Sequence, residues 1–300
     1  MNLVLWVGCA VSAVAGGAAR LLIDQRPDDT VTIWLSQANQ LLFLIAYSFS
    51  LYLWLKIAAD HPAGSIMRMA WLLMAWSSAI SIVRHGFEGT AFLAGWTETV
   101  PTTLLSLRQI PIVLSLVFLA AGLIAMWSSF AAIGLGLRFR RTDWLWFALI
   151  LAFVPVIFSA RENLLDSHSS YAVIRHLQAA SPVLLAVPAL IAVVLHRIRQ
   201  EMGGGQLATS LRLMVAFLVL RLVALSFLGS PFHEHFPAIG ALSQACGWAA
   251  PWLFPLAAVQ RWKVTVSASA LAARYETNPA REIAGLSQIL MTEHAAEPLK

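Results

Sequence analysis

Arginine and glutamine side chains near the ends of long apolar segments are the groups in this chain best suited to bind an anion. An Arg at the centre of a membrane segment costs roughly 2.5–3.5 kcal/mol on insertion scales, so it requires a partner. Arg221 is the clearest case, because it precedes the predicted end of its segment at Leu228 by about two turns, roughly 10 Å. We predict an outward-facing polar cavity lined by Arg84, Glu88, Arg108, Gln109, Arg161, Glu162, Arg175, Gln178, Arg221 and Gln244.

Cations outnumber acids in this predicted cavity. The excess favours a small anionic solute or a lipid headgroup as the ligand, and transport or ligand sensing as the function. An alternative for Arg221 is an internal ion pair with Glu88 or Glu162. A simpler alternative for the whole set is ordinary interface placement, because Arg snorkels towards water and Gln is tolerated near a membrane surface.

Two Arg-His pairs, Arg84-His85 and Arg175-His176, are predicted to lie at similar depths at the outer helix ends. Two imidazoles on facing helices at one level can act as the axial ligands of a b-type haem. A membrane electron-transfer subunit with haem b held by His85 and His176 is therefore the first alternative function. Histidines at the ends of membrane helices are also ordinary polar interface residues.

A metal site is a further alternative, because nitrogen and oxygen ligands of this kind suit zinc or copper. Its candidate ligands are His233, His235, His168 and Asp166. The chain contains no His-Glu-x-x-His run, nucleophile elbow or Walker loop, and no catalytic residues are predicted. We expect a protein that is not an enzyme. The second alternative function is a structural or assembly subunit that pairs with a partner membrane subunit.

The elements that must position these residues are membrane helices. Hydrophobic residues make up 59% of the chain and charged residues 12%, outside the usual range of soluble domains. Apolar runs of about twenty residues recur, which is enough to cross a hydrocarbon layer of about 30 Å. The net charge of +5 comes from Arg and Lys on alternate loops, as the positive-inside rule describes, and does not indicate a nucleic-acid partner. We expect an integral, multi-pass protein of the lipid bilayer, in a bacterial inner (cytoplasmic) membrane.

The predicted fold is an all-α bundle of about eight transmembrane helices with both termini in the cytoplasm. The helices are predicted at residues 2–23, 32–58, 66–86, 104–137, 144–160, 171–198, 207–228 and 237–262. Residues 1–263 form the predicted bundle and 264–300 a short cytoplasmic tail. Seven helices, without the first, is the main competing count. Small residues at 13–19 predict a close-packing face of the first helix rather than a cleavage site.

Two further patterns bear on the predicted cavity. A Gln recurs in the outer third of alternate predicted helices, which suggests four helical-hairpin repeats: Gln37, Gln109, Gln178 and Gln244. Several prolines lie inside predicted helices, where each removes a backbone hydrogen bond: Pro111, Pro155, Pro182, Pro188, Pro251 and Pro255. Carbonyl groups released in this way would need partners or would line a polar cavity.

Overall fold

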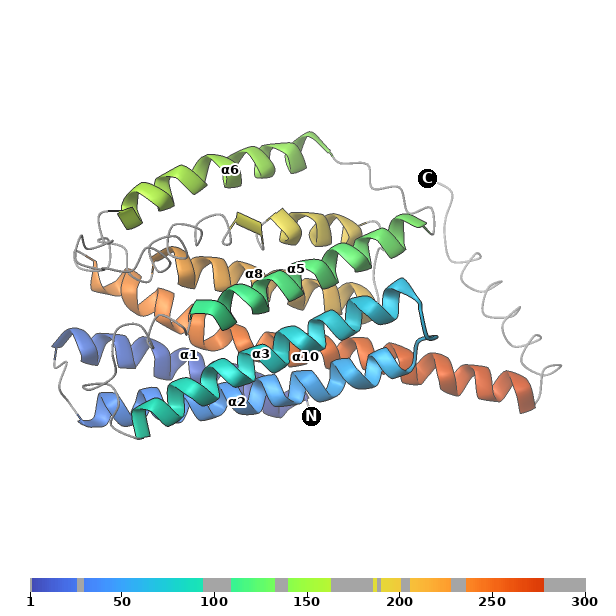
Figure 1. The fold of residues 1–300 in the computed structure, drawn as a ribbon, viewed down its shortest axis with the longest axis horizontal. Helices are drawn as coiled ribbons and strands as arrows, with labels where there is room; N and C mark the ends of the chain where they lie inside the picture. The colour runs from blue at the N-terminus through green and yellow to red at the C-terminus, as the bar shows by residue number, and fades with distance from the viewer. Residues whose placement is uncertain are drawn as a thin grey trace, which may run out of the picture.

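The computed structural model describes residues 2–25, 30–93, 109–132, 140–162, 186–187, 190–200, 206–227 and 236–277, and the regular secondary structure in these ranges is helical. The helices are α1 (Asn2–Gln25), α2 (Thr30–Ala59), α3 (Ile66–Leu93), α5 (Gln109–Ala132), α6 (Arg141–Glu162), α8 (Gln206–Phe227) and α10 (Pro237–Thr277). Residues 190–200 are also helical. Figure 1 shows the helices lying along the long axis of the molecule, with α6 at one edge.

Four of these helices are long and apolar enough to cross a membrane, at Asn2–Leu22, Gln37–Ala59, Ile66–Phe87 and Ile110–Phe130. Each stretch has 21 to 23 residues, which matches the thickness of a bilayer core. Large apolar side chains are exposed on their surfaces, including Leu3, Leu41 and Val83. Such a surface is suited to lipid, and the protein is a multi-pass integral membrane protein.

Helix α10 lies at the centre of the described bundle and packs against α1, α2 and α8. Every residue from 248 to 259 is buried. Around this stretch, the ring of Phe254 lies 5.0 Å from that of Phe217 on α8 and 5.3 Å from that of Trp54 on α2. Trp54 in turn stacks on Trp71 of α3 with ring centroids 5.3 Å apart. Aromatic rings from four helices therefore form one core.

Small residues of α1 allow it to approach α10 closely. Gly8 and Gly16 face tryptophan rings of α10: a Cβ added at Gly8 would lie 2.6 Å from the ring of Trp252. The indole N–H of Trp252 donates to the Ser12 hydroxyl at 2.8 Å, between the two glycines. Ala19, one turn further along, is also buried. The predicted close-packing face of the first helix is confirmed, because small residues are what bring membrane helices together.

The same kind of contact joins α3 to α5. The Ser77 hydroxyl donates to the carbonyl of Ser115 at 2.9 Å, and the Ser115 hydroxyl lies 2.9 Å from that of Ser81. Two turns further along α5, a Cβ added at Gly122 would lie 2.9 Å from the carbonyl oxygen of Ala70. Small and hydroxyl-bearing residues thus set this second close contact.

Two helices are longer than predicted: α3 continues to Leu93, past the predicted end at 86, and α10 continues to Thr277, past the predicted end at 262. As predicted, Pro251 and Pro255 lie inside α10, and Pro155 lies inside α6. Neighbouring helices support a proline-containing membrane helix, so the missing hydrogen bonds do not require a break.

We expect Gly8→Ala to lower the stability of the protein by about 1–3 kcal/mol, because its methyl group would overlap the ring of Trp252. Gly17→Ala is the matched control, since a Cβ there would lie 3.7 Å from the nearest atom, the carbonyl oxygen of Ala241. The midpoint of thermal unfolding in detergent micelles measures the difference. Equal effects of the two substitutions would contradict the proposed α1–α10 contact.

Candidate functional site

Three of the ten residues predicted to line the outer cavity have side chains that the structure describes. Arg84 of α3, Arg221 of α8 and Gln244 of α10 are all half-buried. Four others belong to described helices, but their side chains lie outside the described part: Glu88, Gln109, Arg161 and Glu162. Arg108, Arg175 and Gln178 lie outside the described residues altogether. The predicted convergence of the ten residues therefore stays a prediction.

The outer third of α10 has an arginine-bearing helix on either side. On the α8 side, the Ser243 hydroxyl donates to the carbonyl of Ala224 at 3.0 Å, one turn from Arg221. On the α1 side, a Cβ added at Gly16, one turn from Arg20, would lie 3.0 Å from the carbonyl oxygen of Gln244. Both α1 and α8 run antiparallel to α10. The Cα atoms of Arg20 and Arg221 therefore lie within about 10 Å of each other along the axis of α10. Gln244 lies between these levels.

Arg221 and Arg212 of α8 differ in their exposure, as the helical repeat predicts. Nine residues separate them, so they point to opposite faces of α8. Arg212 is exposed and Arg221 is half-buried. Arg221 is therefore the less exposed of the two arginines of α8.

His85 is almost completely buried, with 3% of its surface exposed. Its Nδ1 lies 2.6 Å from Oε1 of Gln40 on α2, so Nδ1 carries the proton and donates. The imidazole stacks on Tyr47 at 5.6 Å and meets the edge of Phe43 at 4.9 Å. The sequence indicates His85 as a candidate ligand but gives no signal for Gln40, because no spacing rule relates residues on different helices.

The predicted metal ligands, His168, Asp166, His233 and His235, lie outside the described residues, as does the second predicted haem ligand, His176. Within the ranges that the structure describes, no three His, Cys, Asp or Glu side chains are close enough to hold a metal ion.

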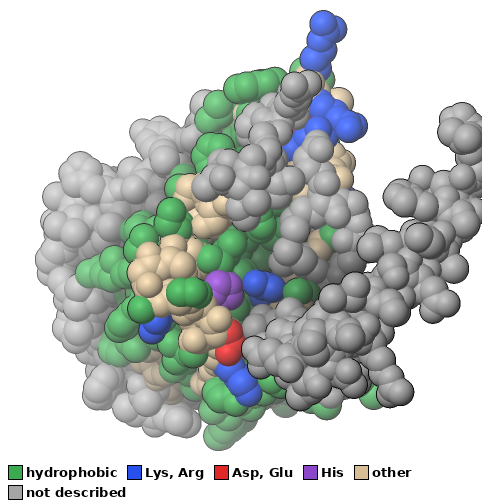
Figure 2. Space-filling view, turned by 90° about the vertical axis from the view of Figure 1, so that its right-hand side faces the viewer, with side chains coloured by type: hydrophobic (Ala, Val, Ile, Leu, Met, Phe, Trp, Pro, Cys, Tyr) green, Lys and Arg blue, Asp and Glu red, His purple; other side chains and the backbone are tan. Residues whose placement is uncertain are grey.

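A second polar cluster, which the sequence does not predict, lies at the opposite end of the bundle. We call this end the inner end, because the sequence predicts that it faces the cytoplasm. Figure 2 looks onto this end, where Lys and Arg side chains lie among hydrophobic and other polar ones. Arg197 and Asp143 are buried there, with Nε and Oδ2 3.9 Å apart. Asp143 Oδ2 also accepts from the backbone N–H of Arg140 at 2.7 Å, half of a capping box at the start of α6.

Two more hydrogen bonds extend this inner cluster. Arg197 donates to Gln200 Oε1 at 3.0 Å, which orients the amide group. The amide nitrogen of Gln200 lies 2.9 Å from Nε2 of His196 and donates to it. His196 is therefore neutral in this arrangement, with its proton on Nδ1. The sequence signal was the spacing of Asp143 three residues after Arg140, typical of a helix start.

Comparison of the chain with protein-family models, curated proteins and solved structures finds no match.

We expect Gln40→Ala and His85→Ala to be non-additive in their effects on stability. The two groups share one buried hydrogen bond, and the double variant should reveal a coupling of about 1 kcal/mol. Thermal unfolding of the wild type, both single variants and the double variant measures it. His61→Ala combined with Gln40→Ala is the control, because His61 follows the opposite end of α2 and the effects should add. An additive result for Gln40 and His85 would contradict the hydrogen bond.

Proposed function

We propose that this membrane protein binds a small anionic solute or a lipid headgroup at its outer end, for transport or ligand sensing. The observation that carries the proposal is the placement of Arg20 and Arg221 on the two helices that flank Gln244 of α10. Two guanidinium groups and an amide on neighbouring helices supply several N–H donors, which suits a carboxylate or a phosphate.

Charge in the proposed site supports an anion over a cation, because its arginines outnumber its acids. Arg20, Arg84 and Arg221 are half-buried at this end. Asp24 and Glu88 follow Arg20 and Arg84 by four residues on the same helices, and Glu88 remains part of the proposed site. Ionisable residues within membrane segments commonly mark functional sites, which supports a role for these arginines.

The proposed site includes the remaining predicted residues, Glu88, Arg108, Gln109, Arg161, Glu162, Arg175 and Gln178. It assumes eight transmembrane helices with both termini in the cytoplasm. The support is that basic residues gather at the end of the described bundle where α2, α3, α6 and α8 meet the inner loops: Lys56, Arg68, Arg140, Arg141 and Arg212. Repeated hairpins with Gln37 and Gln244 at matching positions would place such a site at the repeat interface.

Arg221→Ala is expected to reduce anion binding and flux about tenfold or more, because it removes a charge-assisted contact. The measurements are thermal stabilisation of the purified chain by inorganic phosphate or acetate, and counterflow of the same radiolabelled anions in proteoliposomes. Arg212→Ala is the matched control on the same helix, since Arg212 is exposed near the inner end. This control should retain both activities.

The outcomes separate the possible functions. Binding without flux, lost in Arg221→Ala, would indicate a sensor. Equal binding and flux in Arg221→Ala and the wild type would overturn the proposal. A chain that binds no anion and copurifies with a stoichiometric partner would favour a structural or assembly subunit.

Haem-based electron transfer is the second candidate function, and one observation favours it. The Nδ1–H of His85 donates to Gln40, which is the kind of hydrogen bond that orients a metal-ligating histidine. His176 is the proposed second ligand.

If haem is bound, the purified protein should show a Soret band that His85→Ala abolishes. Arg84→Ala is the control, because it removes a neighbouring charge and leaves the imidazole in place. A protein isolated from haem-replete cells without a Soret band would exclude this function.

A further inference from the structure

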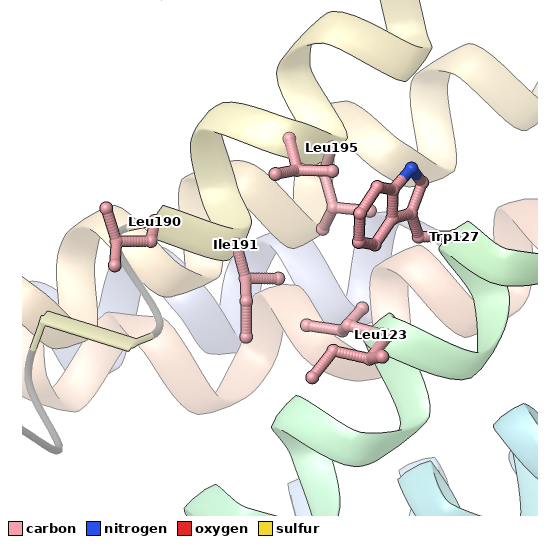
Figure 3. A pocket seen from close by; sticks show the side chains of 7 residues that line it. Leu123, Trp127, Leu190, Ile191 and Leu195 are labelled. Atoms are coloured by element: carbon pink, nitrogen blue, oxygen red, sulfur yellow. The ribbon is translucent and has the colours of Figure 1, made fainter. Parts of the chain in front are cut away.

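The helix at 190–200 borders a different cavity on each of two faces. On one side, Leu190, Ile191 and Leu195 meet Leu123 and Trp127 of α5 around an apolar crevice of about 160 Å³ (Figure 3). On the other side, α6 and α8 complete a larger pocket of about 550 Å³. That volume lies within the range of about 300–1,000 Å³ typical of small-molecule sites. Only the larger pocket combines charged and apolar walls.

Polar residues of this larger pocket lie at the inner end of the bundle. Arg140, Asp143, His196 and Gln200 line it there. The charge of Asp143 is balanced by Arg197, and His196 and Gln200 are joined by a hydrogen bond. The exposed Arg140 therefore gives this end of the pocket a net positive charge. Asp143 and Arg197 behind it are buried, so this part of the polar end is a built feature of the fold.

The rest of the pocket is apolar and extends along the helices. Ile150 lies ten residues beyond Arg140 along α6, about 15 Å at 1.5 Å per residue. Val193, Val219 and Leu222 line the pocket from the other two helices. The pocket thus changes from charged to apolar in the direction from the predicted cytoplasmic surface into the bilayer.

Helix α6 gives lipid access to this pocket. It lies at the edge of the bundle in Figure 1, and apolar side chains on it are exposed, including Leu145, Leu149 and Leu151. In the proposed eight-helix arrangement these side chains contact lipid tails, and the pocket beside α6 faces the bilayer. A soluble anion would leave the apolar walls unused.

We propose that this pocket binds an anionic phospholipid of the inner leaflet, with its headgroup at Arg140 and one acyl chain along Ile150 and Val219. The charged-to-apolar direction of the pocket matches the direction of a phospholipid in that leaflet. The predicted inner leaflet is also the anionic one, and Arg and Lys near its surface attract such headgroups. The pocket lies at the opposite end of the bundle from the proposed anion site and does not depend on it.

Native mass spectrometry of the full chain, released from nanodiscs of equal phosphatidylglycerol and phosphatidylcholine, tests the proposal. The wild type should retain one phosphatidylglycerol in preference to phosphatidylcholine of the same chains. Arg140→Gln, which removes the cation, and Ile150→Trp, which fills the apolar part, should each lower this retention about tenfold.

The neighbouring residues provide matched controls. Arg141→Gln and Leu151→Trp change the same residue types one position along α6, outside the pocket lining, and should retain the lipid as the wild type does. Thermal unfolding confirms that compared variants are folded, and the two test variants act on different parts of the pocket. Equal retention of both lipids by the wild type, unchanged retention in both test variants, or the same loss in the controls would overturn the proposal.

Discussion

The contact between Trp252 of α10 and the glycine-bearing face of α1 is the interaction on which the described bundle depends most. The ring occupies space that Gly8 leaves open, and its N–H reaches Ser12 at 2.8 Å. Lipid tails are as apolar as the helices, so membrane helices associate through close packing and interhelical hydrogen bonds. α10 also accepts a hydrogen bond from Ser210 of α8 through the carbonyl of Ala257. By holding α1 and α8 on either side, α10 sets the spacing of the outer arginines.

The two ends of the bundle handle buried polarity differently. At the outer end, the half-buried Arg20 and Arg221 lie on separate helices that flank the half-buried Gln244 of α10. At the inner end, Asp143 and Arg197 are buried as a pair, and each has a further hydrogen-bonding contact. Buried charges are tolerated when they are paired and hydrogen-bonded. The inner pair joins the start of α6 to the helix at 190–200, and the amphipathic pocket lies beside this attachment.

Helix positions follow from the sequence more closely than helix partners do. The first helix ends at Gln25, two residues past its predicted end, and the third starts at Ile66 as predicted, whereas α3 and α10 extend further than predicted at their C-terminal ends. Apolar run length and loop residues determine these ends. By contrast, the hydrogen bond between His85 and Gln40 joins residues on two helices, and so does the pair of Asp143 and Arg197. Apolar side chains cover helix faces that meet protein and faces that meet lipid, so periodicity does not distinguish them.

The sequence by itself determined that the chain is a helical, multi-pass membrane protein and where its polar groups lie relative to helix ends. Those properties depend on composition and run length along one chain. Only the tertiary structure decided that α10 is central, that Gln40 orients His85, and that Arg140 opens onto an apolar pocket. The physical reason is that each of these features joins side chains from different helices. Their relative rotation and depth are set by interhelical packing rather than by local sequence.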